Sequence, residues 1–299
     1  MDAAALVADW ASRGSVEVVG DDSVFVVDTQ SASGVAPPLL VLHGYPTSSI
    51  DYAGVLGALA ADRRVVLLDF PGFGLSGKPD RAYSLFAQAD VVEAVVASLG
   101  IDEVDLLTHD MGDSVGGELL ARGIDGTLGF GVRRRVLTNG SIYLDLAHLT
   151  DGQQLLAALP DEMIAADAAP DVDALERALT DTLAPAGSPA SHPDPMHVRA
   201  ASVLVVHEGG NRLLAREIRY IDERRKHESR WTGAIERHPA PLSVVWGDHD
   251  PIAVWPMTDE LLRKREGLDT PRTRLEGVGH YPMVEAPAAF ATAVLSGLA

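Results

Sequence analysis

An aspartate with the surroundings of a nucleophile lies in the segment DLLTHDMGDS, residues 105–114. An apolar run precedes Asp110 and a glycine-containing turn and a helical pattern follow it, which is the layout of a nucleophile elbow. Such a strained turn projects one side chain above a sheet, and the N–H groups of the next helix face an oxyanion. The usual glycine two places earlier is replaced by Thr108. Because a carboxylate needs no base to attack saturated carbon, the segment predicts hydrolysis through an ester of Asp110.

An enzyme ester must be hydrolysed by water, and a histidine oriented by an acid is the usual base. His280 lies in GVGHYP after the last expected strand, and Asp250 lies in GDHDP after the strand before it. Asp248 competes for the role of the acid, whereas Asn139 cannot supply a charged partner. The order nucleophile, acid, histidine is the one expected of hydrolases with such an elbow.

Two backbone N–H groups are expected to hold the oxyanion of the hydrolytic step. The segment HGYP at 43–46 follows an expected strand, and its glycine lets the N–H of Tyr45 turn towards the site, beside the N–H of Met111. The run Asp248-His249-Asp250 offers three metal-ligand types, but adjacent residues in one loop rarely converge on one ion. We therefore expect neither a metal nor another cofactor.

Apolar runs that alternate with helical patterns must position these residues. Strands are expected at 16–19, 24–27, 39–42, 64–68, 104–108, 135–138, 242–246 and 272–275, and helices at 52–61, 85–99, 114–122, 257–265 and 288–298. This alternation predicts an α/β fold with a mostly parallel eight-stranded sheet covered by helices on both faces. Between residues 141 and 238 the strand signal nearly vanishes, so we predict a helical cap (141–238) inserted into a core domain (1–140 and 239–299).

Composition limits the partners of the chain. It has 299 residues, no cysteine and a formal net charge of -19, which excludes disulfides and thiolate sites and disfavours binding to nucleic acid or anionic membranes. The basic clusters 133–135 and 224–226 are expected on solvated faces. With no secretory signal and no long apolar run, we expect a cytoplasmic monomer or homodimer.

The chain resembles α/β-hydrolases of the branch that contains epoxide hydrolases and haloalkane dehalogenases. Within that branch it is most similar to the mesoderm-specific transcript family. The resemblance covers essentially the whole chain and is carried by HGYPTSSIDY (43–52), DFPGFGLSGKP (69–79), LLTHDMGDSVGGELL (106–120), RYIDERRKHESRWTGAI (219–235) and GVGHYPMVEAP (277–287).

The resemblance implies two reactions that differ in how the leaving group is stabilised. Dehalogenases of this branch place a tryptophan after the nucleophile, where this chain has Met111. Epoxide hydrolases use an HG-aromatic-Pro loop, which Tyr45 fits, and cap tyrosines, for which Tyr220 is the better candidate and Tyr143 the other. The expected substrate is a small apolar epoxide hydrolysed by water. Haloalkane hydrolysis, an esterase or lactonase in which Asp110 is a bystander, and a non-enzymatic binding protein remain alternatives.

Overall fold

A computed structural model of the chain describes residues 2–30 and 36–299. Within them one sheet contains eight strands in the order β1-β2-β4-β3-β5-β6-β7-β8, with parallel pairing from β4 through β8. β1 and β2 form an antiparallel hairpin, and β2 pairs antiparallel with β4. The strands are β1 Ser15–Val19, β2 Asp22–Asp28, β3 Leu39–Leu42, β4 Val65–Leu68, β5 Glu103–His109, β6 Gly131–Thr138, β7 Leu242–Gly247 and β8 Arg272–Leu275.

Helices lie on both sides of this sheet. The α-helices are α1 Ala3–Ala11, α2 Leu56–Leu59, α3 Leu85–Ser98, α4 Met111–Asp125, α5 Asp151–Ala158, α6 Val172–Thr180, α7 Pro195–Val206, α8 Leu214–Glu217, α9 Tyr220–Arg237, α10 Pro256–Lys264, α11 Pro282–Glu285 and α12 Pro287–Gly297. Short 3-10 helices span Ser49–Tyr52, Leu144–Leu146 and His207–Arg212. The α/β fold predicted from the sequence is confirmed.

The central strands are buried on both faces, as is usual when helices cover a parallel sheet. In β3, Leu40 and Leu42 belong to a core shared with α3, α4 and α9, whereas Leu39 and Val41 face a second core with α2 and α12. The alternation of side chains along a strand thus distributes one apolar run between two cores. The parallel strands then end at a common edge, where the loops that follow them meet.

Two helical expectations differ from the structure. The helix expected at 52–61 is a 3-10 turn followed by the four residues of α2. α4 begins at Met111 and not at residue 114, because helical geometry continues through Gly112 despite its low intrinsic propensity. The sequence analysis also did not predict α1, which is capped by Asp2 and packs against α7.

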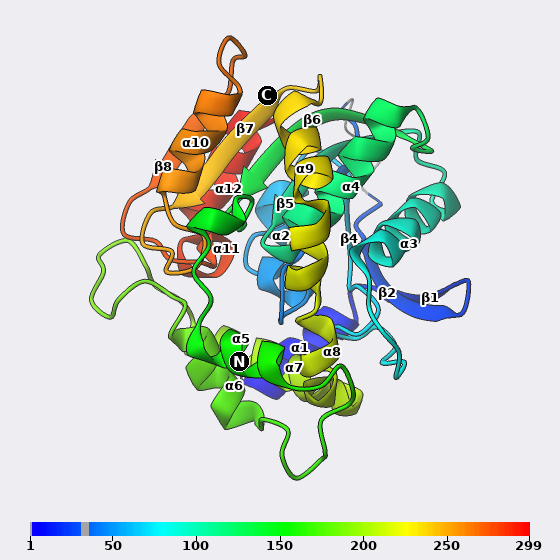
Figure 1. Cartoon of the computed structure of the whole chain (residues 1–299), viewed down its shortest axis with the longest axis vertical. Helices are drawn as coiled ribbons and strands as arrows, with labels where there is room; N and C mark the ends of the chain where they lie inside the picture. The colour runs from blue at the N-terminus through cyan, green and yellow to red at the C-terminus, as the bar shows by residue number, and fades with distance from the viewer. Residues whose placement is uncertain (1, 31–35) are drawn as a thin grey trace.

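Only helices occur between β6 and β7 in the described chain, apart from the single bridge Ala147–Ala253. Figure 1 shows α5, α6, α7 and α8 grouped at one end of the molecule beside α1. α9 leads from this group back along the core, where it packs against α4. The segment thus reaches the same strand ends that carry the expected site.

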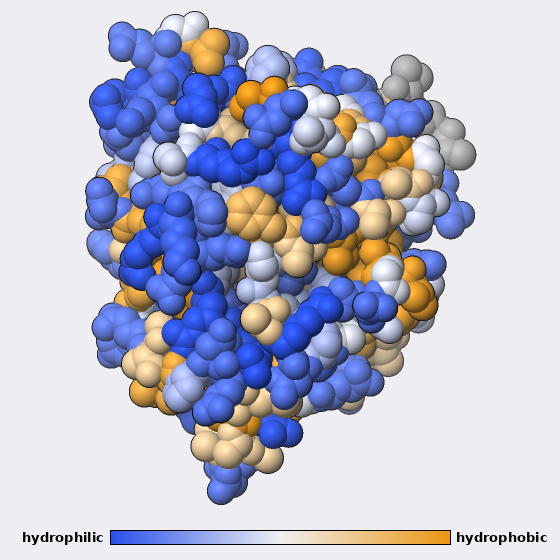
Figure 2. All heavy atoms as spheres, turned by 45° about the vertical axis from the view of Figure 1, so that its right-hand side comes forward, coloured by the Kyte–Doolittle hydropathy of each residue, from blue (hydrophilic) through white to orange (hydrophobic). Residues whose placement is uncertain are grey.

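One face of the molecule is mainly hydrophilic. Figure 2 shows polar and charged residues over most of one face, with apolar residues gathered in smaller patches. Among the described residues, no helix is long and apolar enough to cross a membrane.

Candidate active site

Asp110 lies in a strained turn between β5 and α4. Its backbone has φ 50° and ψ -117°, outside the regions that L-residues favour, and its side chain is buried. The turn is crowded: a Cβ on Gly44 would lie 2.6 Å from the Cβ of Asp110. Thr108, which replaces the usual glycine, fits because Gly116 lies opposite, where a Cβ would be 2.8 Å from the threonine methyl carbon. The small residue that this turn requires is thus Gly116 on the helix, whereas the usual motif has a glycine on the strand at the position of Thr108.

The two carboxylate oxygens of Asp110 have different neighbours. Oδ1 accepts the N–H of Tyr45 at 2.8 Å. Oδ2 lies 3.7 Å from Nε2 of His280. Met111 begins α4 directly after Asp110, so its N–H is one of the first-turn donors that have no partner within the helix. One oxygen is therefore held at the expected oxyanion site and the other faces the imidazole.

His280 and Asp250 follow β8 and β7 and meet at a hydrogen bond of 2.8 Å between Nδ1 and Oδ2. The same Oδ2 accepts an N–H from Asn139 at 2.9 Å. The other oxygen, Oδ1, accepts the backbone N–H groups of Ile252 and Ala253 at 2.7 and 2.9 Å. Both carboxylate oxygens of Asp250 thus accept hydrogen bonds from donors in the surrounding loops. These hydrogen bonds hold the carboxylate, and with it the imidazole of His280, in one position.

The protonation of His280 follows from this environment. Burial favours the neutral imidazole, but the carboxylates of Asp250 and Asp110 outweigh it and raise the pKa to about 9. His280 is therefore protonated at neutral pH.

Two other histidines near the site are neutral and bound to the backbone. Burial lowers the pKa of His43 and brings that of His109 to about 4. Nε2 of His43 accepts the N–H of Phe70 at 3.0 Å, and Nε2 of His109 lies 2.8 Å from the carbonyl oxygen of His280. These rings fix loops around the site, which leaves His280 as the imidazole that faces Asp110.

The two tyrosines expected to assist the leaving group lie in different places. Tyr220, at the start of α9, is buried with its ring centroid 5.6 Å from that of Tyr45. Burial and the charge of Asp110 raise the pKa of its phenol well above the usual value, so the hydroxyl keeps its proton. Tyr143 instead donates its hydroxyl to Glu236 at 3.1 Å, near the other end of α9. The structure brings Tyr220 to the candidate site and does not bring Tyr143 there.

A cavity of about 90 Å³ adjoins the site between the core and the helical segment. The core contributes Tyr45, Ile252 and Tyr281, and the walls from α5, α6 and α8 are mostly apolar, with Leu156, Leu175, Leu179 and Leu214 among them. Apolar walls with a few polar groups at one end are typical of small-molecule sites.

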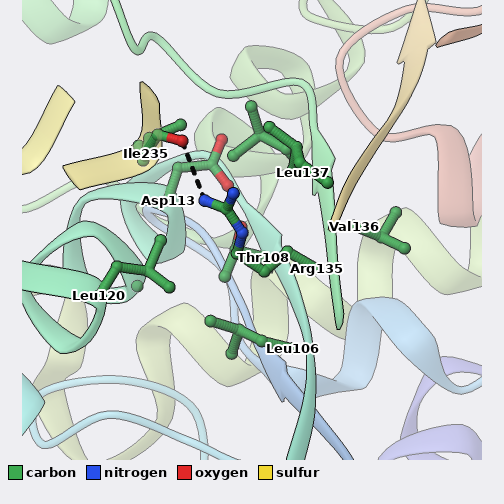
Figure 3. Close-up of a pocket in the computed structure, with 10 residues that line it drawn as sticks. Leu106, Thr108, Asp113, Leu120, Arg135, Val136, Leu137 and Ile235 are labelled. Atoms are coloured by element: carbon green, nitrogen blue, oxygen red, sulfur yellow. Dashed lines mark hydrogen bonds between the residues drawn. The ribbon is translucent and has the colours of Figure 1, made fainter. Parts of the chain in front are cut away.

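A second cavity, lined by residues of α4, β5 and β6, is too small for a substrate. Figure 3 shows Thr108, Asp113 and Arg135 around it, with the guanidinium of Arg135 donating to the carbonyl oxygen of Ile235 at 2.9 Å. Its volume is about 10 Å³, roughly the least that a water molecule occupies. Of these two cavities, the one next to Tyr45 is the larger.

The acidic run that resembles a metal site has other partners. Asp248 accepts from Arg274 at 2.7 Å and from the N–H of Gly277, while Asp250 binds His280. Within residues 2–30 and 36–299 no three histidine, aspartate or glutamate side chains are grouped to hold an ion.

Sequence reasoning missed the roles of two residues near the site. Asn139 was rejected as a charged partner, yet it binds the carboxylate of Asp250 and, through its own Oδ1, the N–H of Gly247 at 2.9 Å. Arg224 was expected on a solvated face, but it is only 5% exposed, whereas its neighbour Arg225 is exposed. The position of Arg224 four residues after Tyr220, on the same face of one helix, is the signal that could have revealed it.

Comparison with known proteins places the chain in a family. Residues 39–293 match the Alpha/beta hydrolase family. The chain is 40% identical over 291 residues, 97% of each protein, to the putative hydrolase LipZ of Mycobacterium tuberculosis. It is 30% identical to the mesoderm-specific transcript homolog protein of Homo sapiens, over 96% of this chain and 86% of the relative. A soluble epoxide hydrolase of Corynebacterium sp. matches 28% of the chain and 29% of its own length at 37% identity.

Solved structures confirm the fold. An enol-lactonase from Burkholderia xenovorans and a putative epoxide hydrolase from Pseudomonas aeruginosa each align with 95% of this chain at a TM-score of 0.73, covering 99% and 94% of their own chains. Their sequence identities of 19% and 22% support the fold alone. The predicted resemblance is confirmed: the chain belongs to the alpha/beta hydrolase family and is a hydrolase.

Proposed function

We propose that the chain hydrolyses epoxides to diols through a covalent ester of Asp110, beneath a cap formed by residues 141–238. The observation that carries this proposal is the pair of contacts made by Asp110. Its Oδ1 accepts the N–H of Tyr45 at 2.8 Å, and its Oδ2 lies 3.7 Å from Nε2 of His280. An ester formed at Oδ2 therefore has its carbonyl oxygen already at a hydrogen-bond donor and its carbonyl carbon near a base.

In the first step, Oδ2 of Asp110 bonds to an epoxide carbon and the carbon–oxygen bond of the ring breaks. The freed oxygen takes a proton from the hydroxyl of Tyr220, which burial keeps protonated in the resting site. The product is a hydroxyalkyl ester. Negative charge has moved from the carboxylate of Asp110 to the phenolate of Tyr220.

In the second step, water adds to the ester carbon of Asp110 and gives a proton to His280. The N–H groups of Tyr45 and Met111 hold the oxyanion that forms at Oδ1. When the tetrahedral intermediate collapses, the leaving oxygen of the diol takes the proton from His280. The second proton of the water passes from the carboxyl of Asp110 to the phenolate of Tyr220, which restores the carboxylate and the phenol. Since the charge of Asp110 helps to raise the pKa of His280, ester formation removes part of that increase and frees the imidazole to act as a base.

The tryptophan of the proposed cap favours an epoxide over a haloalkane. A halide site of the tryptophan type needs an indole N–H that is free to bind the halide. Trp231, the one tryptophan within the proposed cap, donates its N–H to Glu118 at 2.9 Å. Trp10 and Trp246 donate theirs to Ser49 and to the carbonyl of Ala253. The phenol of Tyr220 is instead a donor suited to the oxygen of an epoxide.

Intact-mass spectrometry of the His280→Gln variant tests the proposal. After exposure to styrene oxide, we expect an adduct equal to the whole epoxide, located by peptide mapping at Asp110, because ring opening proceeds without the base. A His280→Gln, Asp110→Asn double variant should remain unmodified. If 1-chlorohexane but not styrene oxide labels His280→Gln, the reaction is dehalogenation. If neither labels it and Asp110→Asn still cleaves p-nitrophenyl butyrate, the chain is an esterase that does not use Asp110 as its nucleophile.

A further inference from the structure

Arg224 differs from the other deeply buried arginines of the described chain. Among the residues that the structure describes, four arginines are at most 6% exposed, and three of them are bound. Arg63 donates to Asp105 at 3.0 Å, Arg135 to the carbonyls of Ile235, His238 and Ala240, and Arg265 to the carbonyl of Ile235 and the hydroxyl of Thr270. Within residues 2–30 and 36–299, no acceptor is hydrogen-bonded to the guanidinium of Arg224, and no carboxylate lies within 4.0 Å of it. A buried cation without a partner lowers the stability of the folded state, so the burial of Arg224 needs a functional explanation.

The helix that carries Arg224 places it at the candidate site. Tyr220 and Arg224 are four residues apart on α9, so they share the face that packs on α4. The guanidinium is close enough for its charge to interact with Tyr220, Asp110, Asp113 and Glu228. Arg224 thus lies on the cap side of the nucleophile.

None of the nearby carboxylates serves as its partner. Burial, together with the charge of Asp110, raises the pKa of Asp113 well above its usual value and favours the neutral acid. Glu228 accepts the N–H of Leu144 at 2.9 Å. Asp110 is engaged by Tyr45 and faces His280. The five N–H donors of the guanidinium are therefore left for a bound molecule, and their planar fork matches a carboxylate in two parallel hydrogen bonds.

We propose that Arg224 binds a carboxylate of the substrate, so that the chain acts on electrophilic carboxylic acids whose reactive carbon is close to the acid group. This inference rests on the proposed function, because it places the reactive carbon at Asp110. The cavity of about 90 Å³ beside Tyr45 has mostly apolar walls, which suit the apolar remainder of such a molecule. The positive charges of Arg224 and His280 offset the repulsion between the substrate anion and Asp110.

Calorimetric titration with phenylacetate, which cannot react, tests the anion site without any turnover. Phenylacetamide is the neutral probe. The wild-type chain should bind phenylacetate about 10- to 100-fold more tightly than phenylacetamide, as expected for a charged hydrogen-bonded pair. Arg224→Gln should remove this preference, and Arg224→Lys should keep part of it. Arg225→Gln, on the exposed neighbour in the same helix, is the matched control and should bind as the wild type does.

Equal affinity of the wild type for the two probes, no binding of either, or an undiminished preference in Arg224→Gln would overturn the inference. Should Arg224→Gln not fold, the preference of the wild type and its change in Arg224→Lys still decide the question.

Kinetics separate this inference from the proposed function. The probes are trans-3-phenylglycidate and its amide, two epoxides that differ in the acid group alone. Arg224→Gln should lower the ratio of kcat/KM for the acid to that for the amide about 10- to 100-fold, mainly through KM. Hydrolysis of the amide without any preference for the acid would refute the carboxylate site and leave epoxide hydrolysis standing. Binding of phenylacetate through Arg224 without turnover of either epoxide would refute epoxide hydrolysis and leave the carboxylate site standing.

Discussion

Replacement of Asp250 by asparagine should stop the cycle at the ester. The oxygen Oδ1 of Asp250 accepts two backbone N–H groups, so an asparagine would keep its carbonyl oxygen there and place its NH₂ group at the position of Oδ2. That NH₂ group would face the donor of Asn139 and force Nδ1 of His280 to accept a hydrogen bond. The imidazole proton would then lie on Nε2, the nitrogen that faces Asp110. In this tautomer His280 cannot take a proton from water.

The size of the effect follows from comparable changes. An acid-to-amide replacement beside a catalytic histidine lowers kcat about 10⁴-fold, and the same tautomer error operates here. That factor corresponds to about 5.4 kcal/mol in the barrier of the hydrolytic step. Attack by Asp110 on styrene oxide does not use the base, so its rate should change little. Quenched-flow samples analysed by intact mass should therefore show almost complete esterification of the variant within its first turnover.

Asp248→Asn is the matched control for Asp250→Asn. Asp248 lies in the same loop but binds Arg274 and the N–H of Gly277, so its replacement should leave the lifetime of the ester unchanged. The reasoning would be refuted if Asp250→Asn hydrolysed the ester as fast as the wild type, or if Asp248→Asn accumulated it equally.

Three further predictions follow from buried charged groups. Single-turnover hydrolysis of the ester should speed up as the pH rises, with a midpoint below the resting pKa of about 9 for His280, because the esterified Asp110 no longer adds its charge; a rate independent of pH between 6 and 9 would contradict this. Burial raises the pKa of Asp51 from 3.8 to about 7, so the folded state loses stability as the pH rises through this window, and Asp51→Asn should be more stable by up to about 4 kcal/mol at pH 8 and by little at pH 4. Equal gains in urea unfolding at both pH values would contradict it. Glu118→Ala should cost about 2 to 3 kcal/mol in urea unfolding, since Arg122, Arg230 and Trp231 all donate to this buried carboxylate; a loss below about 1 kcal/mol would show that solvent and the other partners of the two arginines replace it.

The sequence was sufficient for the parts of the site that depend on local patterns. An apolar run, Asp110 and Gly112 predict the turn, and glycines and histidines after the other strands predict the loops that meet there. Parallel strands end at one edge of the sheet, so order along the chain translates into proximity in space.

The helical segment could not be predicted in this way, because its helices are positioned by packing between distant parts of the chain. Arg224 and Arg225 are adjacent in one basic cluster, and only the rotation of α9 about its axis against α4 decides which of them is buried. Tyr143 and Tyr220 are likewise equivalent in residue type, and only the packing of the helices separates their roles. Tyr220 begins α9, whereas Tyr143 contacts Glu236 near the other end of that helix. Asn139 was missed because its role depends on hydrogen bonding to Asp250 and not on charge.

The anchoring of α9 limits how molecules can reach Asp110. Both Asp110 and His280 are only 1% exposed, so entry requires part of the protein to move. The second half of α9 is fastened to the core through Arg230 and Trp231, which both donate to the buried carboxylate of Glu118. These contacts tie the helix that carries Tyr220 to the core. We therefore expect molecules to enter and leave on the side of α5 and α6, the two short helices that wall the cavity next to Tyr45.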